Sequence, residues 1–143
     1  MQVPHQSVVL VVDGRKLLFL RNEGDEAYPN LQVEHAEERP NPADREQKTD
    51  AAGAASSTVS GTMGETDFHQ QEEDRFAADA ADLLRRRALA NEFESLIIIA
   101  APRTLGELRK HYHKEVSDRL TGELAKDLTG HPIPDIEKAL LSA

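Results

Sequence analysis

The 143-residue chain carries 26 acidic and 17 basic side chains, which give a formal net charge of −9, and 38% of its residues are hydrophobic. This length suits a single domain over residues 1–143 with a sizeable core. The acidic balance disfavours general binding to DNA or RNA through overall charge, although a local basic patch could still bind one. The absence of cysteine excludes disulfides and thiolate metal sites.

The first expected elements are two strands joined by a tight turn. In the stretch SVVLVVDGRKLLFLRNEG (residues 7–24), two apolar runs flank Asp13-Gly14, a pair suited to the positive backbone angles of a hairpin turn. Both runs are apolar at nearly every position, which indicates strands that are covered on both faces. A third strand is expected within residues 30–38, where Leu31 and Val33 alternate with polar neighbours that favour an edge position.

The apolar run at residues 8–12 is the nearest approach to a targeting or membrane segment. It is interrupted after five residues. A signal peptide needs about 7–15 uninterrupted apolar residues, and a membrane span needs about 20. We therefore expect a cytoplasmic protein that does not interact with membranes.

Between residue 40 and about residue 66 the composition changes to small, polar and glycine residues. This segment has too little apolar surface to offset the entropy lost on ordering, so we interpret it as a mobile internal loop. A helix capped by Thr66 or Asp67 is expected next, because apolar residues from Phe76 to Ala88 recur at helical spacing.

The second half of the chain is expected to alternate strands and helices. Residues 93–101 (FESLIIIAA) are typical of a buried parallel strand, and Pro102 is well placed to begin a helix that ends near His111. Residues 116–128 fit either a helix or a strand, and the chain order favours a strand. A short helix from Pro134 or Asp135 closes the chain.

The resulting order, βββ-α-β-α-β-α, predicts an α/β fold of the ribonuclease H-like type, with a mixed sheet of about five strands and helices packed on it. Four segments carry a more specific resemblance, namely VLVVDGRKLLFLRNEG, HQQEEDRFAADAADLLRRR, LIIIAAPRTLGELRK and ELAKDLTGHP. In these segments the chain resembles the bacterial host attachment protein family (protein required for attachment to host cells), which is related to the middle domain of archaeal–eukaryotic peptide-chain release factors. The resemblance covers nearly the whole chain. It implies a cytoplasmic, ribosome-associated domain and supports the strand interpretation of residues 118–128.

Peptidyl-tRNA hydrolysis in the manner of those release factors is not expected. The relatives act through a Gly-Gly-Gln loop that positions a water molecule on the peptidyl ester. The corresponding segment here contains Gly53, Gly61 and Gly64, followed by Gln70-Gln71, and no glycine pair precedes a glutamine.

The residues also give no support to metal-dependent chemistry, and we expect no cofactor. A ribonuclease H-like nuclease needs several carboxylates that converge on two metal ions. Asp13 falls at the expected hairpin turn, Asp79 and Asp82 lie on the first expected helix, and LIIIAA contains no acid. A zinc site needs at least three protein ligands. No such spacing is present among the six scattered histidines, His5, His35, His69, His111, His113 and His131.

The best candidate for an anion or partner contact is the basic segment after the buried strand. This segment contains three acidic residues, Glu107, Glu115 and Asp118, and five basic residues. The basic residues are Arg103, Arg109, Lys110, Lys114 and Arg119. Arg103 lies just beyond the carboxyl end of a parallel strand, where α/β sheets bind ligands. The alternative, which we favour, is that these are solvated side chains of a helix that Pro102 begins.

We therefore predict a non-catalytic binding module that contacts the ribosome, through its RNA, or a protein partner by means of residues 103–119. Two alternatives stay open. One is a hydrolase that uses the 40–66 loop as a lid, and the other is a factor that acts directly in attachment to host cells. The lack of an export signal argues against the second alternative.

Overall fold

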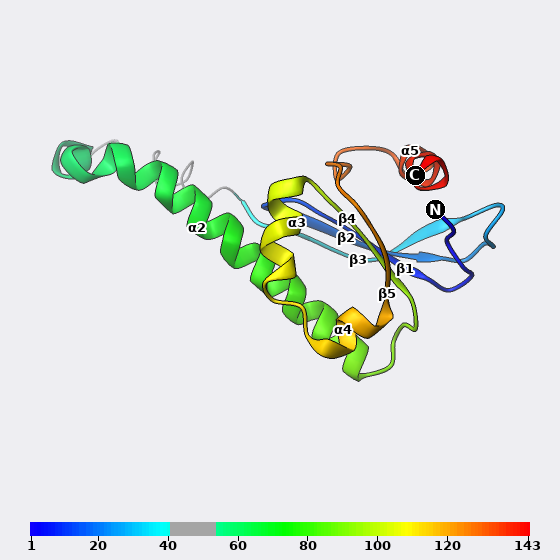
Figure 1. Cartoon of the computed structure of the whole chain (residues 1–143). Helices are drawn as coiled ribbons and strands as arrows, with labels where there is room; N and C mark the ends of the chain where they lie inside the picture. Colours follow the sequence, from blue (N-terminus) through cyan, green and yellow to red (C-terminus); the bar gives the residue numbers. More distant parts are fainter. Residues whose placement is uncertain (41–53) are drawn as a thin grey trace.

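Five strands form one open mixed sheet in the order β3-β2-β1-β4-β5 (Figure 1). The computed structural model describes the backbone of residues 1–40 and 54–143 and the side chains of residues 1–40 and 67–143. Its strands are β1 (Val8–Val12), β2 (Lys16–Asn22), β3 (Leu31–Glu38), β4 (Leu96–Ala100) and β5 (Leu120–Leu124). β1 and β2 pair antiparallel, as do β2 and β3, whereas β4 is parallel to both β1 and β5. This order confirms the expected ribonuclease H-like α/β fold and the edge position of β3.

The turn between β1 and β2 is held by the side chain of Asp13. One carboxylate oxygen of Asp13 accepts hydrogen bonds from the backbone N–H groups of Arg15 and Lys16 at 2.7 and 2.6 Å. The turn does not use the positive backbone angles that the sequence predicts, because no described glycine has a positive φ. Gly14 instead leaves room for the Glu73 side chain, which would have to move if a Cβ atom were present, because that atom would lie 2.6 Å from Cγ of Glu73.

The helix α2 (Ala54–Leu89) begins earlier than predicted and corrects the second half of the expected loop. Thr66 and Asp67 lie inside this helix and do not cap it. The first half of the expected loop, residues 41–53, lies outside the described residues. The stripe from Phe76 to Ala88 packs into the hydrophobic core, as its helical spacing predicts. Residues 54–66 are rich in Ser, Thr and Gly, which are weak helix formers, so the early start of α2 runs against local propensity.

Helices cover both faces of the sheet (Figure 1). One face packs against α2, α3 (Pro102–Arg109) and α4 (Lys114–Arg119), and its core includes Phe76, Leu84 and Leu108. The other face packs against α5 (Ile133–Ser142) through Ile136 and Leu140. β1 and β4 are buried at every position because both of their faces are covered, as their apolar sequences predict. None of the helices in the described part of the chain is long and apolar enough to cross a membrane.

The ambiguous stretch at residues 116–128 is divided between a helix and a strand. α4 ends at Arg119 and β5 follows directly, so two helices separate β4 from β5 where one was expected. His113 caps α4, because its Nδ1 atom accepts a hydrogen bond from the backbone N–H of Glu115 at 3.0 Å. Gly122 allows Met1 to approach β5, since a Cβ atom there would lie 2.8 Å from the Met1 sulfur.

Candidate functional site

The carboxyl ends of β1 and β4 form the point of the sheet where ligands are expected in an α/β fold. The two strands are parallel neighbours, and the chain leaves them toward opposite edges of the sheet. A cavity of about 440 Å³ lies beside this point, between α2 and α3. It is lined by Gln70 and Asp74 of α2 and by Arg103, Glu107 and Lys110 of the α3 segment. The structure thus brings two of the predicted cations, Arg103 and Lys110, to one concave surface.

Charges within this cavity balance. Lys110 Nζ pairs with Glu107 at 3.1 Å, and the Gln70 amide donates to a carboxylate oxygen of Asp74 at 2.6 Å. The Arg103 side chain forms no ion pair with any residue whose side chain is described. Two cations and two carboxylates therefore line the cavity, and Arg103 is the cation best placed to bind an external anion.

Arg109 is held by the fold itself. Its Nη2 atom donates to Glu123 of β5 at 2.7 Å, and the Tyr112 hydroxyl donates to the same carboxylate at 2.8 Å. These hydrogen bonds, with that from Arg109 the stronger influence, hold the pKa of Glu123 below its ordinary value. Burial, followed by the bond to Glu123, raises the pKa of Tyr112. This group fastens α3 to the edge strand, so Arg109 has a structural role.

Arg119 is also occupied within the molecule. Its guanidinium donates to the backbone oxygen of Phe93 at 2.9 Å and to the carboxylate of Glu115 at 2.7 Å. A further bond reaches the side-chain oxygen of Asn91 at 2.8 Å. Arg119 therefore joins α4 to the connection between α2 and β4, and only 17% of its side chain is exposed.

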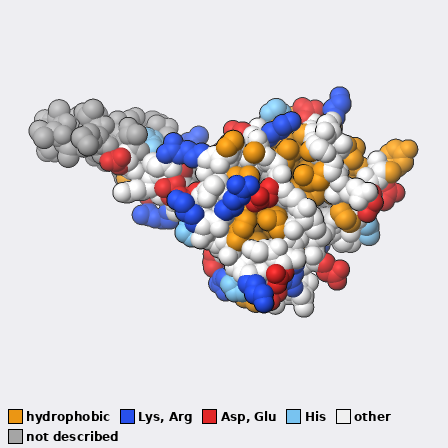
Figure 2. Space-filling view, viewed as in Figure 1, with side chains coloured by type: hydrophobic (Ala, Val, Ile, Leu, Met, Phe, Trp, Pro, Cys, Tyr) orange, Lys and Arg blue, Asp and Glu red, His pale blue; other side chains and the backbone are white. Residues whose placement is uncertain are grey.

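Lys114 begins α4 with its side chain exposed, and it forms no ion pair with a residue whose side chain is described. Arg103 and Lys114 thus form no ion pair with a described side chain, and Lys110 pairs only with Glu107 of its own helical segment. Arg109, although 56% exposed, and Arg119 both bond to other elements of the fold. Figure 2 shows Lys and Arg side chains over α3 and α4 with Asp and Glu side chains among them. We call the exposed faces of these two helices and the adjoining cavity the α3–α4 surface.

One partly buried contact at the carboxyl ends of the strands could not be predicted from the sequence. The Thr129 hydroxyl lies 2.6 Å from the second carboxylate oxygen of Asp13 and 3.1 Å from Asp127. Asp13 is thus a turn residue, as predicted, but it also anchors the segment before α5. No sequence pattern points to this pairing, because 116 residues separate Thr129 from Asp13. Across residues 1–40 and 67–143, no three His, Cys, Asp or Glu side chains lie close enough to hold a metal ion.

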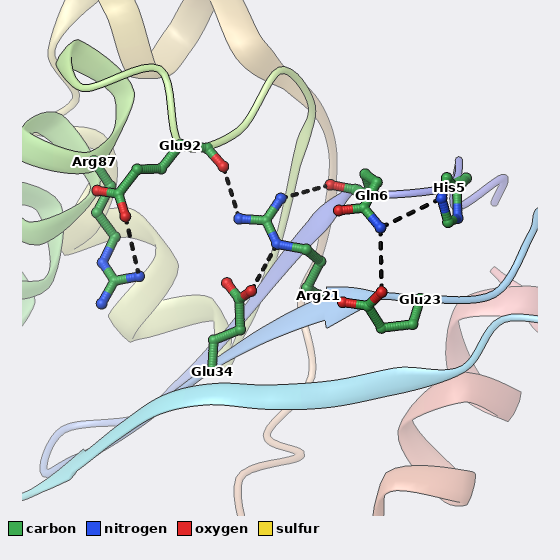
Figure 3. A network of polar contacts seen from close by, with 7 residues as sticks. All are labelled: His5, Gln6, Arg21, Glu23, Glu34, Arg87 and Glu92. Atoms are coloured by element: carbon green, nitrogen blue, oxygen red, sulfur yellow. Dashed lines mark hydrogen bonds and ion pairs between the residues drawn. The ribbon is translucent and has the colours of Figure 1, made fainter.

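A second polar network lies at the opposite end of the sheet and is structural (Figure 3). Arg21 donates to the Glu34 carboxylate at 2.8 Å and to the backbone oxygens of Gln6 and Glu92 at 3.0 and 2.7 Å. Gln6 has a positive φ of 68°, a conformation that these contacts hold in place. Arg21 thereby ties three separate segments together, a role that β2's sequence pattern does not indicate.

The fold and the site define a ribonuclease H-like α/β domain with a mixed-charge surface on the helices that follow β4. The chain belongs to the bacterial archaeo-eukaryotic release factor family 12, whose family model matches residues 6–140. This match confirms the relationship to release factors that the sequence resemblance implied, while the host attachment family stays a prediction. No curated protein matches the chain.

Proposed function

We propose that this chain is a non-catalytic, cytoplasmic binding module that associates with the ribosome through the α3–α4 surface. The observation that carries the proposal is the match to a release factor family over residues 6–140, which indicates a module related to translation. Within that context, the exposed cations Arg103, Lys110 and Lys114 supply the group of side chains best suited to a partner.

The hydrogen bonds of Asp13, the acidic residue after β1, support the proposal that the chain is not catalytic. Both carboxylate oxygens of Asp13 accept hydrogen bonds, one from the turn and the other from Thr129. A carboxylate occupied in this way is poorly placed to take a proton from a substrate. Gln70, a glutamine of the segment that corresponds to the release-factor loop, bonds to Asp74 within α2.

Sedimentation of cell lysate through sucrose gradients tests ribosome association directly. We expect the wild-type chain in ribosomal fractions at low salt and less of it there at high salt, because contacts through exposed cations are screened. A triple variant, Arg103→Ala with Lys110→Ala and Lys114→Ala, should leave these fractions. Absence of the wild-type chain from every ribosomal fraction, even at low salt, would overturn the proposal.

A matched control is provided by Lys138→Ala on α5, which removes an exposed cation from the opposite face of the sheet. This variant should sediment as the wild-type chain does. The hydrolase alternative is tested separately by assay of generic ester and phosphodiester substrates, and turnover by the intact chain would replace the non-catalytic assignment. The attachment alternative predicts the chain at the cell surface, which cell fractionation would detect.

A further inference from the structure

We propose that the free edge of β3 binds an extended, basic peptide segment of another protein, which adds to the sheet as a further strand. β3 is the outermost strand of the sheet and pairs with β2 alone. This edge is separate from the α3–α4 surface, so the inference does not depend on the proposed function.

Two contacts show which backbone groups of β3 face outward. The N–H of Arg39 donates to the backbone oxygen of Arg15 at 2.7 Å, so Arg39 faces β2. The N–H of Leu31 donates to the carboxylate of Glu137 on α5 at 2.8 Å, so Leu31 faces away from β2. Because inward-facing and outward-facing residues alternate along an antiparallel strand, counting from these two ends identifies the outward-facing backbone groups. They belong to Val33, Ala36 and Glu38, and no residue in the described ranges 1–40 and 67–143 bonds to them.

The two faces of β3 differ in character along this edge. Val33 and Ala36 lie opposite apolar residues of β2 that belong to the core on the α5 side of the sheet. Glu37 lies opposite a β2 residue that belongs to the core on the α2 side, and Glu34 bonds to Arg21 on that same side. Side chains of neighbouring strands on the same face contact one another. An added strand therefore meets apolar side chains on one face and carboxylates on the other.

An apolar strip borders the edge on the α5 side. Val33 is 50% exposed and Leu141 is 47% exposed, which is unusual for large apolar side chains of this chain. Val33 follows Leu31 by two residues and lies on the same face of β3, whereas Leu141 follows Glu137 by four residues and lies on the same side of α5. Both side chains thus lie close to the contact of β3 with α5, where they can pack against apolar residues of an added strand.

The edge carries negative charge. Residues 23–38 contain six acidic residues and no lysine or arginine. Arg21 of β2 neutralises Glu34 at 2.8 Å (Figure 3). Lys16 lies opposite Glu38 in the β2–β3 register, but neither Glu37 nor Glu38 forms an ion pair with a lysine or arginine whose side chain is described. Charge complementarity therefore selects a peptide that carries lysine or arginine.

Two cations of α2 lie near this edge without neutralising it. Arg86 and Arg87 line a cavity together with Glu37. Arg86 pairs with a carboxylate of its own helix at 3.1 Å, and the guanidinium of Arg87 lies over the Phe19 ring at 4.3 Å. The described partner of Glu37 is His35 at 3.5 Å, which carries a charge only when it is protonated. The carboxylate of Glu37 is therefore available to a cation of the peptide.

A second copy of this chain suits the edge poorly. Pairing of two β3 strands would place the carboxylates of Glu34, Glu37 and Glu38 beside the same residues of the other copy, and like charges on paired strands are destabilising. β3 also contains a bulge, at the point where its register with β2 shifts between Phe19 and Leu20. A bulge hinders pairing between two folded edges, whereas a flexible peptide can follow it.

The test is a fluorescence anisotropy titration of a labelled octapeptide of alternating lysine and valine with the whole chain. Binding should weaken as salt is added, because salt screens exposed charges. An octapeptide of alternating glutamate and valine should not bind, because its charges repel those of the edge. A lysine–valine octapeptide that is N-methylated at every residue should not bind either, because it keeps its cations but cannot donate backbone hydrogen bonds to β3.

Two variants locate the contact. Ala36→Pro removes an N–H that points away from β2, so the ladder with β2 is retained while affinity for the peptide should fall by about tenfold. Its control, Ala36→Thr, keeps the N–H and should bind as the wild-type chain does. Glu37→Gln should weaken binding by about two- to fivefold. Asp118→Asn, which removes an exposed carboxylate from α4 beside the opposite edge strand, should have no effect.

Circular dichroism checks that the variants are folded, and if Ala36→Pro is not, the N-methylated peptide decides between strand addition and another mode of binding. Failure of the wild-type chain to bind the lysine–valine peptide would overturn the inference. Equal binding of the N-methylated peptide, or of the unmodified peptide by folded Ala36→Pro, would exclude strand addition at β3. Dimerisation in sedimentation equilibrium that Ala36→Pro abolishes would instead assign the edge to a second copy.

Discussion

Arg109 on α3 and Glu123 on β5 form a forked ion pair in which Nη2 and Nε of the guanidinium donate to one carboxylate oxygen at 2.7 and 3.1 Å. The pair joins a helix to the edge strand of the sheet, and the Tyr112 hydroxyl completes the set of donors. Arg109, one of the five cations predicted to bind a partner, therefore has a structural role in the fold.

Replacement of Glu123 by glutamine should destabilise the fold by about 1–2 kcal/mol, because the charge-assisted hydrogen bonds from Arg109 are lost and a half-buried group is left poorly paired. Urea unfolding followed by circular dichroism measures this change. Glu94→Gln is the matched control, since Glu94 is exposed and forms no ion pair with the described residues. An equal effect of the two substitutions would contradict the structural role of the pair.

The pH dependence of stability should reveal the same carboxylate. The pKa of Glu123 is lowered in the folded chain from an ordinary value of 4.5, mainly by the hydrogen bonds from Arg109. Its contribution is therefore complete above pH 4.5 and is lost as the pH falls through the lower, folded-state pKa. Unfolding free energies measured across this acid range should fall less steeply for Glu123→Gln than for the wild-type chain.

The dependence of stability on alkaline pH should reveal Tyr112. Its pKa is raised from 10.0, first by burial and then by the bond to Glu123. A raised pKa contributes stability that is complete below pH 10 and is lost as the pH rises toward the folded-state value. Tyr112→Phe should lose this alkaline dependence, whereas Tyr28→Phe, at an exposed position, should retain it. Identical alkaline profiles for the two variants would count against the assignment.

Thr129→Val should lower the free energy of unfolding by about 1–2 kcal/mol. Valine has a similar shape to the buried threonine but lacks its hydroxyl, so the second carboxylate oxygen of Asp13 would lose its hydrogen-bond donor. Thermal unfolding measures the change. Ser142→Ala provides the comparison, because the Ser142 hydroxyl bonds to a backbone oxygen at the exposed end of α5 and its loss should have little effect.

Two glycines should respond in opposite directions to the same substitution. Gly24→Ala would place a Cβ atom 2.3 Å from the backbone oxygen of Tyr28 and should destabilise the chain by about 1–3 kcal/mol. Gly106→Ala meets open space inside α3 and should stabilise it by about 0.5–1 kcal/mol, because alanine loses less backbone entropy in a helix. Denaturant midpoints of the two variants on either side of the wild-type value are the expected result.

Much of the fold could be predicted because its signals are local. The apolar runs of β1 and β4, the polar alternation in β3 and Pro102 at the start of α3 each reflect burial or backbone geometry within a few residues. The start of α2 and the division of residues 114–124 between α4 and β5 were predicted less well. The first residues of α2 are weak helix formers, and Gly122 lies against Met1, which is far away in the sequence, so neither feature has a local signal.

The sequence by itself determined the number and position of the strands along the chain, the edge position of β3 and the presence of five cations after β4. Only the tertiary structure decided which of those cations bond to other elements of the fold. Arg109 and Arg119 meet acceptors on β5, on α4 and in the connection before β4, and Arg103 and Lys114 meet none among the described side chains. The physical reason is that the availability of a charged group depends on partners brought to it by folding, and residue type and spacing do not report those partners.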